Sequence, residues 1–315
     1  MTSLNEHAWR KFEEAAEQWE RLGIAVDRSA CGAKLIDAGV HASGGLAAGL
    51  AIAEIGMAGL GTSSLAPDLN GARSGLSVAT MSDHPLEACY LGQAAHWPVK
   101  IGAFHAMGSG PACLLNPDLN VGRAFGFEEK SDCAVLVLES AALPGDEICR
   151  ALADLLRVRP ARLAIITAPT ASLAGSAQIA ARSVETGLHK LHHLGFDLRC
   201  ATSAVAYCPL AVPAGDDLTA LGRTNDAIIY GSRFWLFTRG ISDEALERWA
   251  ARLPSETSPI YGEPFLRILQ TAGEFYNIDP GLFAPAEATL ANLESGRSFH
   301  AGGVDLMRLE AALKG

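Results

Sequence analysis

The sequence lacks three features that would point to common classes of protein. The longest apolar runs, such as residues 134–138 and 163–166, have the length of a strand and fall far short of the roughly 20 residues that cross a bilayer. No lysine–arginine tract is present, which argues against a general nucleic-acid binder that releases phosphate counterions. The seven cysteines include no CxxC pair, which argues against a cysteine-based zinc site.

The N-terminal stretch also lacks the character of a signal peptide. Residues 1–22 carry five glutamates that interrupt any apolar core. The odd number of scattered cysteines is typical of reduced thiols, so we expect a cytoplasmic protein in which most cysteines are small core residues. A formal charge of −10 is compatible with a locally basic pocket.

Glycine, by contrast, is abundant and clustered. The chain has 32 glycines in 315 residues, about 10% against a usual value of about 7%. Many lie beside Ser, Thr or Ala, as they would in the backbone of a binding pocket or in tightly packed elements. The 49% hydrophobic content and the length predict large cores and about two domains.

Strand and helix patterns interleave along the chain. Apolar spacing predicts helices over residues 5–22 and 172–194, and further patterns predict a helix over 146–156 and strands over 34–40, 133–139, 163–167, 201–206 and 232–238. We therefore expect an α/β fold (mixed α+β) of two lobes, with mixed sheets flanked by helices. Loop-like residues 116–131 place the boundary between lobe A (residues 1–125 with part of the C-terminal segment) and lobe B (residues 126–315).

A strand followed by a turn of small residues and a helix start lies at residues 163–176. The turn Ala-Pro-Thr-Ala-Ser gathers free backbone N–H groups with the hydroxyls of Thr170 and Ser172, which suits an anionic or carbonyl group of a ligand. The glycine and lysine spacing of nucleotide-binding loops is absent. The alternative is ordinary N-capping of the helix by Ser172.

The helix predicted over residues 172–194 carries a polar stripe. At 100° per residue, five side chains fall within about 80° of one another: Gln178, Arg182, Glu185, His189 and His192. One interpretation is the solvated face of an amphipathic helix, with Arg182 and Glu185 as a weak surface pair. The other is a site, since the neighbouring residues, which include Gly187, are small enough to let a ligand approach closely.

Arginine three residues before glutamate is a chemically useful arrangement. A guanidinium favours the ionised form of a partly buried carboxylate, while desolvation opposes it. A carboxylate balanced in this way can hold a water molecule and accept its proton near neutral pH. His189, His192 and His193 have helical spacing for a metal, but no carboxylate or cysteine accompanies them, so we expect no metal site.

Other polar, glycine-marked turns complete the set of candidate segments. Ser82-Asp83-His84-Pro85 also fits simple helix capping, and Met107-Gly108-Ser109-Gly110-Pro111 lacks the spacing of a nucleophile elbow. Gly222-Arg223-Thr224-Asn225-Asp226 and Tyr230-Gly231-Ser232 are two more. Together these turns are typical of a cleft that binds a large polar ligand, with their glycines as pocket backbone.

These segments resemble the methenyltetrahydromethanopterin cyclohydrolase family. The matching residues keep their order from near residue 35 to near residue 300. They comprise Ser82–Pro85, Ala106-Met107-Gly108-Ser109-Gly110-Pro111-Ala112, Ala168-Pro169-Thr170-Ala171-Ser172, Gly175-Ser176-Ala177-Gln178-Ile179, Arg182-Ser183-Val184-Glu185-Thr186, Gly222–Asp226 and Ile278-Asp279-Pro280-Gly281-Leu282-Phe283-Ala284-Pro285. Each segment is weak alone, and the ordered set is specific.

The resemblance implies both a reaction and a site. The family reversibly hydrolyses the methenyl group of a tetrahydromethanopterin carrier (possessing or lacking its phosphate) to the formyl derivative, without a metal or prosthetic group. Its subunits have two α/β lobes with the pocket between them and form homo-oligomers, trimers among them. The resemblance implies Arg182 and Glu185 as the catalytic pair and the following residues as substrate contacts: Asp83, Ser109, Gly110, Thr170, Ser172, Gln178, Asn225 and Asp226.

One segment departs from the family pattern. Archaeal members have a turn containing Gly-Arg where this chain has Val205-Ala206-Tyr207-Cys208-Pro209, which affects the contacts to part of the carrier. Six lysines against 19 arginines, with abundant alanine, favour a bacterial, methylotroph-type member that serves formaldehyde oxidation. The alternatives are a pterin-binding paralogue that does not catalyse and a metal-dependent amidohydrolase.

Overall fold

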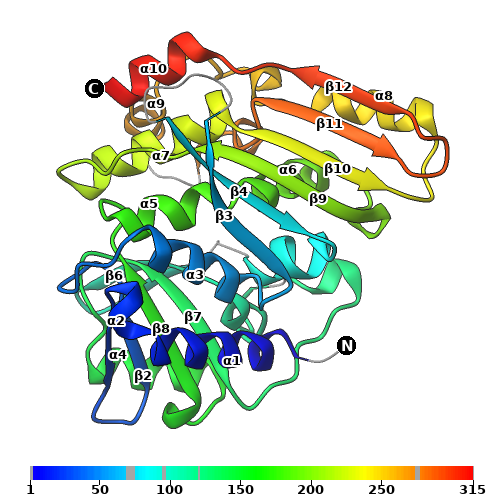
Figure 1. Ribbon diagram of the computed structural model, residues 1–315. Helices are drawn as coiled ribbons and strands as arrows, with labels where there is room; N and C mark the ends of the chain where they lie inside the picture. Colours follow the sequence, from blue (N-terminus) through cyan, green and yellow to red (C-terminus); the bar gives the residue numbers. More distant parts are fainter. Residues whose placement is uncertain (1–2, 69–74, 94–96, 120, 274–276, 315) are drawn as a thin grey trace. The chain divides into compact units, whose positions relative to one another are not determined.

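The computed structural model describes residues 3–68, 75–93, 97–119, 121–273 and 277–314. These residues form two compact units, each built from helices and one mixed sheet (Figure 1), so the α/β prediction with two mixed sheets is confirmed. The predicted boundary at residue 125 falls inside unit 1. Unit 1 consists of Met1–Gly61 with Glu87–Gln178, and unit 2 of Thr62–Leu86 with Ile179–Gly315.

The sheet of unit 1 has a parallel centre and antiparallel edges. Its strand order is β1-β2-β8-β7-β6-β5, in which β2, β8 and β7 run parallel. The strands are β1 (Ala25–Arg28), β2 (Lys34–Asp37), β5 (Trp97–Ile101), β6 (Phe104–Ser109), β7 (Ala134–Glu139) and β8 (Leu163–Ala168). The predicted strands at 34–40, 133–139 and 163–167 are therefore present.

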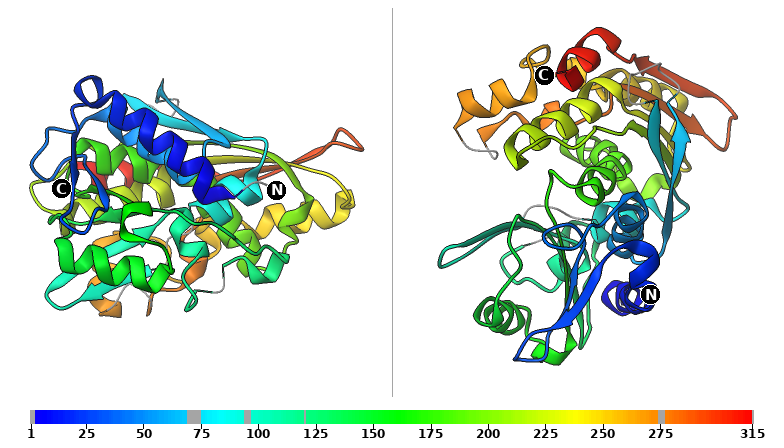
Figure 2. Two further views of the ribbon diagram at one scale, coloured as in Figure 1. Left: turned by 90° about the horizontal axis from the view of Figure 1, so that it is seen from below. Right: turned by 60° about the vertical axis from the view of Figure 1, so that its left-hand side comes forward.

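Helices cover both faces of this sheet, which explains why β7 and β8 are apolar along nearly their whole length. Leu136 and Leu138 of β7 face a core shared with α4 (Asp146–Leu156). On the other face, α1 (Leu4–Glu17) and α3 (Leu46–Gly56) pack against β7. Figure 2 shows α1 and α4 on opposite sides of the sheet.

The sheet of unit 2 has the order β12-β11-β10-β9-β4-β3. The pair β10–β11 is parallel, and the pairs β11–β12, β9–β10 and β4–β9 are antiparallel. Three helices pack on its strands: α6 (Ser183–His193), α7 (Asp217–Gly231) and α8 (Asp243–Arg252). The buried residues of β9 and β10 alternate with half-exposed ones. The strands are β3 (Gly61–Pro67), β4 (Leu76–Ser82), β9 (Ala201–Pro209), β10 (Arg233–Thr238), β11 (Glu287–Asn292) and β12 (Ser298–Gly302).

Two predicted helices are each divided in the structure, so both predictions of continuous helices are wrong. The helix expected over residues 5–22 is α1 followed by the short α2 (Trp19–Leu22), and it ends at Gly23, as predicted. The backbone of this glycine is left-handed. The helix expected over 172–194 is α5 (Leu173–Ala180) and α6 (Ser183–His193). The remaining α-helices are α7 (Asp217–Gly231), α8 (Asp243–Arg252), α9 (Phe265–Ala272) and α10 (Leu306–Lys314).

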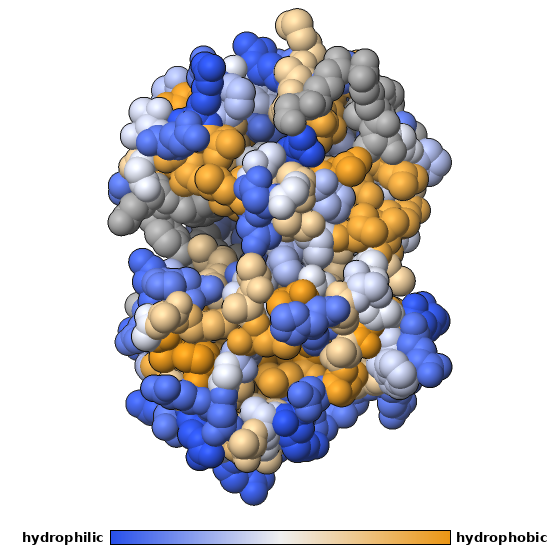
Figure 3. All heavy atoms as spheres, turned by 90° about the vertical axis from the view of Figure 1, so that its left-hand side faces the viewer, coloured by the Kyte–Doolittle hydropathy of each residue, from blue (hydrophilic) through white to orange (hydrophobic). Residues whose placement is uncertain are grey.

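The apolar residues left at the surface are scattered. The most exposed, Met307 at 79% and Val212 at 62%, are single residues on different segments, and Figure 3 shows a face on which hydrophilic and hydrophobic side chains are mixed. Such exposure is ordinary for folded proteins. Across the described ranges, no helix has the length and apolarity needed to cross a membrane.

Candidate functional site

Arg182 and Glu185 lie together at the N-terminus of α6 in unit 2. Arg182 is the N-cap residue, and Glu185 occupies the first turn of the helix. Arg182 Nη2 is 3.6 Å from Glu185 Oε2, and the two side chains are only 10% and 11% exposed. The interpretation as a solvated surface pair is therefore wrong, because helix packing removes both groups from water.

The division between α5 and α6 changes the predicted polar stripe. Arg182 N donates to Ile179 O at 3.0 Å, which turns the chain between the two helices. Gln178 therefore lies on α5, whereas Glu185, His189 and His192 lie on α6. The stripe is therefore divided between two helices. Glu185, His189 and His192 keep their helical spacing on α6, next to the N-cap residue Arg182.

Packing on the sheet fixes the first turns of α6. Ser183 Oγ donates to Ala180 O at 2.6 Å, and Thr186 Oγ1 donates to Arg182 O at 3.1 Å, so side chains satisfy the carbonyls at the helix junction. A Cβ on Gly187 would lie 2.9 Å from the Phe234 ring. The expectation that Gly187 leaves room for a ligand is wrong, since the ring of β10 occupies that space.

This location suits a carboxylate that works as a base. The N-terminus of a helix carries partial positive charge, which stabilises the anionic form of a side chain in the first turn. A nearby guanidinium acts in the same direction. Glu185 thus lies buried beside two sources of positive potential within one turn of helix.

A second group of predicted residues lies in unit 1, where parallel strands end. Glu139 and Ala168 are paired last residues of β7 and β8, and the turn 169–172 follows. Ser172 Oγ accepts from Gly175 N at 2.9 Å and donates to Pro169 O at 2.7 Å. Ser172 therefore caps the helix, as one of the two interpretations predicted. Thr170 is buried in the same turn.

Gln178 and Ser109 are buried in the same unit. Gln178 Nε2 donates to Glu139 Oε1 at 3.0 Å, which joins α5 to the end of β7. Ser109 is the last residue of β6, and Gly110 (φ 96°) follows it as the N-cap of a short 3₁₀ helix. The segment 107–111, expected to be a turn, therefore begins as the last part of strand β6. Glu139 itself was not singled out from the sequence.

Asp37 is a further residue that sequence reasoning missed. Its carboxylate, at the end of β2, accepts hydrogen bonds from the backbone N–H groups of four consecutive residues at 2.7–3.0 Å: Gly39, Val40, His41 and Ala42. Burial acts to raise the pKa of Asp37, but these bonds outweigh it and the pKa is lowered. The carboxylate therefore shapes the loop that follows β2.

Replacing Asp37 with asparagine should destabilise unit 1 by about 2 kcal/mol at pH 7, since an amide cannot accept all four bonds. The lowered pKa means that this stabilisation is present above the unfolded value of about 3.9 and disappears as the pH falls through the folded value. Urea unfolding at pH 7 and pH 3 measures it. Asp27→Asn, on exposed β1, is the control; an equal difference between Asp37→Asn and wild type at both pH values would contradict the argument.

The predicted contacts of unit 2 lie on two elements. Asp83, exposed after β4, accepts from Ser203 Oγ at 2.7 Å. Asn225 and Asp226 lie inside helix α7, so the turn predicted at 222–226 is wrong. Asn225 Nδ2 donates to Leu221 O at 2.9 Å.

Asp226 is almost completely buried. Burial raises its pKa to about 7, against the opposing effect of a hydrogen bond from Phe265 N. That bond, at 2.8 Å, anchors the start of α9. One oxygen of Asp226 is thus already engaged within the fold.

The segment that departs from the family pattern is a strand in this protein. Val205–Pro209 belongs to β9, and Tyr207 packs edge-on against Trp235 of β10, with ring centroids 5.8 Å apart. Tyr207 therefore has a packing partner on the neighbouring central strand of the sheet. A turn bearing an arginine is not formed by these residues.

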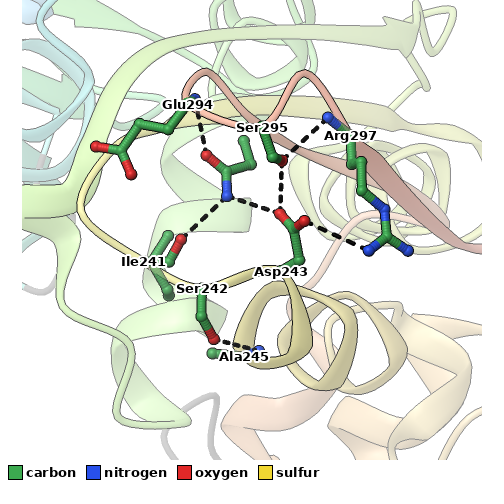
Figure 4. Close-up of polar contacts among 8 residues, drawn as sticks. Ile241, Ser242, Asp243, Ala245, Glu294, Ser295 and Arg297 are labelled. Atoms are coloured by element: carbon green, nitrogen blue, oxygen red, sulfur yellow. Dashed lines mark hydrogen bonds and ion pairs between the residues drawn. The ribbon is translucent and has the colours of Figure 1, made fainter.

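A cavity of about 490 Å³ lies elsewhere in unit 2, between the start of α8 and the turn joining β11 to β12. Asp243 accepts from Asn292 Nδ2 and Ser295 Oγ, both at 2.7 Å, and pairs with Arg297 (Figure 4). These polar groups bind one another and hold the turn onto the helix. None of the predicted site residues lines this cavity. In the part of the chain that the structure describes, no His, Cys, Asp or Glu cluster is arranged to hold a metal ion.

Comparison with known proteins gives the class of the protein and then its family. A family model described as Cyclohydrolase matches residues 3–313. Three similar proteins are all named methenyltetrahydromethanopterin cyclohydrolase: one from Rhodopirellula baltica (42% identity; 88% of this chain and 85% of that protein), one from Methylobacillus flagellatus (40%; 92% and 88%) and one from Methanococcoides burtonii (38%; 97% and 96%). The chain belongs to the methenyltetrahydromethanopterin cyclohydrolase family, and the resemblance found from its motifs is confirmed.

Proposed function

We propose that this protein hydrolyses the methenyl group of methenyltetrahydromethanopterin to the formyl derivative, reversibly. The observation that carries the proposal is the buried Arg182–Glu185 pair at the start of α6, in a chain whose family match covers residues 3–313. The substrate carbon is already an electrophile, because it belongs to a cationic amidine. The reaction therefore requires a positioned water and a base.

Glu185 is the proposed base. It accepts a proton from the water as the oxygen attacks the methenyl carbon, which gives a neutral tetrahedral carbinolamine. The hydroxyl of this intermediate then loses its proton as one carbon–nitrogen bond breaks, and the departing nitrogen takes up a proton. The products are the formyl amide and one proton released overall.

Arg182 is proposed to keep Glu185 ionised and oriented. Its positive charge repels a cationic substrate unless the carboxylate lies between them, so the arrangement requires Glu185 to face the substrate. Orientation and electrostatics supply most of the acceleration in such a site. Residues proposed to contact the substrate or to shape its binding surface are Asp83, Ser109, Gly110, Thr170, Ser172, Gln178, Asn225 and Asp226.

The proposal extends to the cellular role. We infer a homo-oligomeric, cytoplasmic enzyme that needs no prosthetic group. The proposed role is in one-carbon metabolism, namely formaldehyde oxidation in a methylotroph-type bacterium. Sedimentation at several protein concentrations tests the oligomer. Absorption spectra of the purified enzyme and metal analysis test for a resident cofactor.

Purified protein should bleach the methenyl chromophore of the substrate and form the formyl derivative, with activity unchanged after dialysis against EDTA. The reason is that water attack on an amidinium carbon needs no Lewis acid when a base is positioned. A spectrophotometric rate assay measures both. Loss of activity on chelation would favour the metal-dependent amidohydrolase, and binding of the pterin without turnover would favour the non-catalytic paralogue.

A further inference from the structure

The helix that carries Glu185 in its first turn also carries a buried lysine near its other end. Lys190 is only 3% exposed, and lysines are rarely buried without partners. Its Nζ donates to Gly281 O at 2.5 Å and to Thr257 Oγ1 at 3.3 Å. Burial lowers the pKa of Lys190, while Asp279 acts to raise it. The ammonium thus ties α6 to two loops of unit 2.

Asp279 completes this attachment. Its Oδ2 accepts from Ser258 Oγ at 2.6 Å and its Oδ1 from Gly281 N at 3.0 Å. A Cβ on Gly281 would lie 3.1 Å from Lys190 Nζ and from both oxygens of Asp279, so the two charges converge on this glycine. The other charged groups that act here are Arg252 on Lys190 and His193 on Asp279.

We propose that Lys190 is a positioning residue for the reaction. It lies five residues after Glu185, about 7.5 Å along the helix axis, and its bond to Gly281 O restrains how far α6 can slide or rotate. Between them, Gly187 packs directly against the Phe234 ring of β10, so the first turns of α6 rest on the sheet and the lysine anchors the other end of the helix. The segment 278–285, for which the sequence suggested no role, contains Gly281, whose carbonyl accepts the hydrogen bond from this lysine. The inference rests on the proposed function.

The test separates positioning from stability. Lys190→Met should lower kcat about 30-fold with KM within about twofold, because a small displacement of the base slows chemistry more than binding. The variant leaves the Gly281 carbonyl without this donor and will be less stable, because a buried acceptor that loses its hydrogen bond costs free energy. Lys130→Met, at a highly exposed lysine, is the matched control.

Asp279→Asn separates the role of the lysine from the stability of this attachment. This variant should lower the midpoint of urea unfolding, because Ser258 Oγ and Gly281 N both donate to the Asp279 carboxylate, but Lys190 keeps its bond to Gly281 O and kcat should stay within about twofold of the wild type. Hydrogen exchange should be faster at the amide of Thr186, which donates to Arg182 O at 2.9 Å, in Lys190→Met and not in Asp279→Asn. A kcat that falls equally in the two variants, or a folded Lys190→Met that keeps kcat within twofold of wild type, would overturn the proposal.

Failure of the proposed function is distinguishable from failure of this inference. The wild-type protein and Lys130→Met are assayed first, and an absence of turnover in both contradicts the proposed reaction. The exchange measurement needs no substrate. Unchanged exchange at the Thr186 amide in Lys190→Met would by itself reject the positioning role.

Discussion

Replacing Glu185 with glutamine should lower kcat for methenyl hydrolysis by about 10³-fold and change KM little. The amide has almost the same size and can still accept a hydrogen bond from water, but it cannot take the proton, and a positioned general base contributes about this factor. The measurement is the initial rate of methenyl bleaching over a range of substrate concentrations. A loss confined to kcat identifies an interaction made in the transition state.

The burial of the pair explains why the effect should be large. Counted over the whole residue, Glu185 and Arg182 are each 8% exposed. Bulk water therefore cannot reach the site freely and take the place of the lost base. Because Arg182 is proposed to act through Glu185, the effects of Arg182→Ala and Glu185→Gln should not add. The double variant should be about as slow as Glu185→Gln alone.

Glu147→Gln provides the control for helix position. Glu147 occupies the first turn of α4, as Glu185 does in α6, but its side chain is exposed. The control should retain wild-type rate and KM. If Glu185→Gln keeps more than a tenth of the wild-type kcat, another group accepts the proton and the assignment of Glu185 is wrong.

The proximity of Arg182 and Glu185 could be predicted from sequence, because residues three apart meet on any helix. Their burial could not, since it depends on how β4, β9 and β10 pack beneath α6. The break before Ser183 was also hidden. No glycine or proline lies between Ser176 and Thr186, and at the turn the Ser183 hydroxyl donates to the Ala180 carbonyl at the end of α5.

Patterns in the sequence mark two other features of the structure, the start of α7 and the loop after β2. Asp216 followed by Thr219 is an N-cap pattern, and Asp216 Oδ1 accepts from Thr219 N at 2.9 Å to begin α7. The polar residues at 222–226 obscured that helix. Asp37 precedes a glycine-rich stretch, which is typical of a loop whose N–H groups gather on a carboxylate.

The glycines taken as pocket backbone have a different explanation at several positions. A Cβ on Gly222 would meet Leu266 at 3.3 Å, and one on Gly231 would meet Pro209 at 2.8 Å. These residues are small because neighbouring elements pack against them. The glycine surplus therefore reports close packing at least as much as a binding surface, and Gly175 is the extreme case.

Gly175→Ala should destabilise unit 1 by about 3 kcal/mol, the upper end of the usual cost of overpacking. The new Cβ would lie 2.0 Å from Pro169 O and 3.0 Å from Thr170 Cα. Both are backbone atoms of the turn after β8, so no side-chain rotation can relieve the clash. The turn must shift, and the bond from Gly175 N to Ser172 Oγ must weaken with it.

Urea unfolding measures the loss, and Gly215→Ala is the matched control. A Cβ on Gly215 would meet nothing within 4 Å, and its backbone conformation is open to alanine, so the midpoint should stay the same or rise slightly. Because the same turn carries Thr170 and Ser172, residual folded Gly175→Ala should also bind substrate more weakly. An unfolding midpoint equal to that of Gly215→Ala would show that the turn can move freely. It would contradict the conclusion that the turn packs tightly against α5.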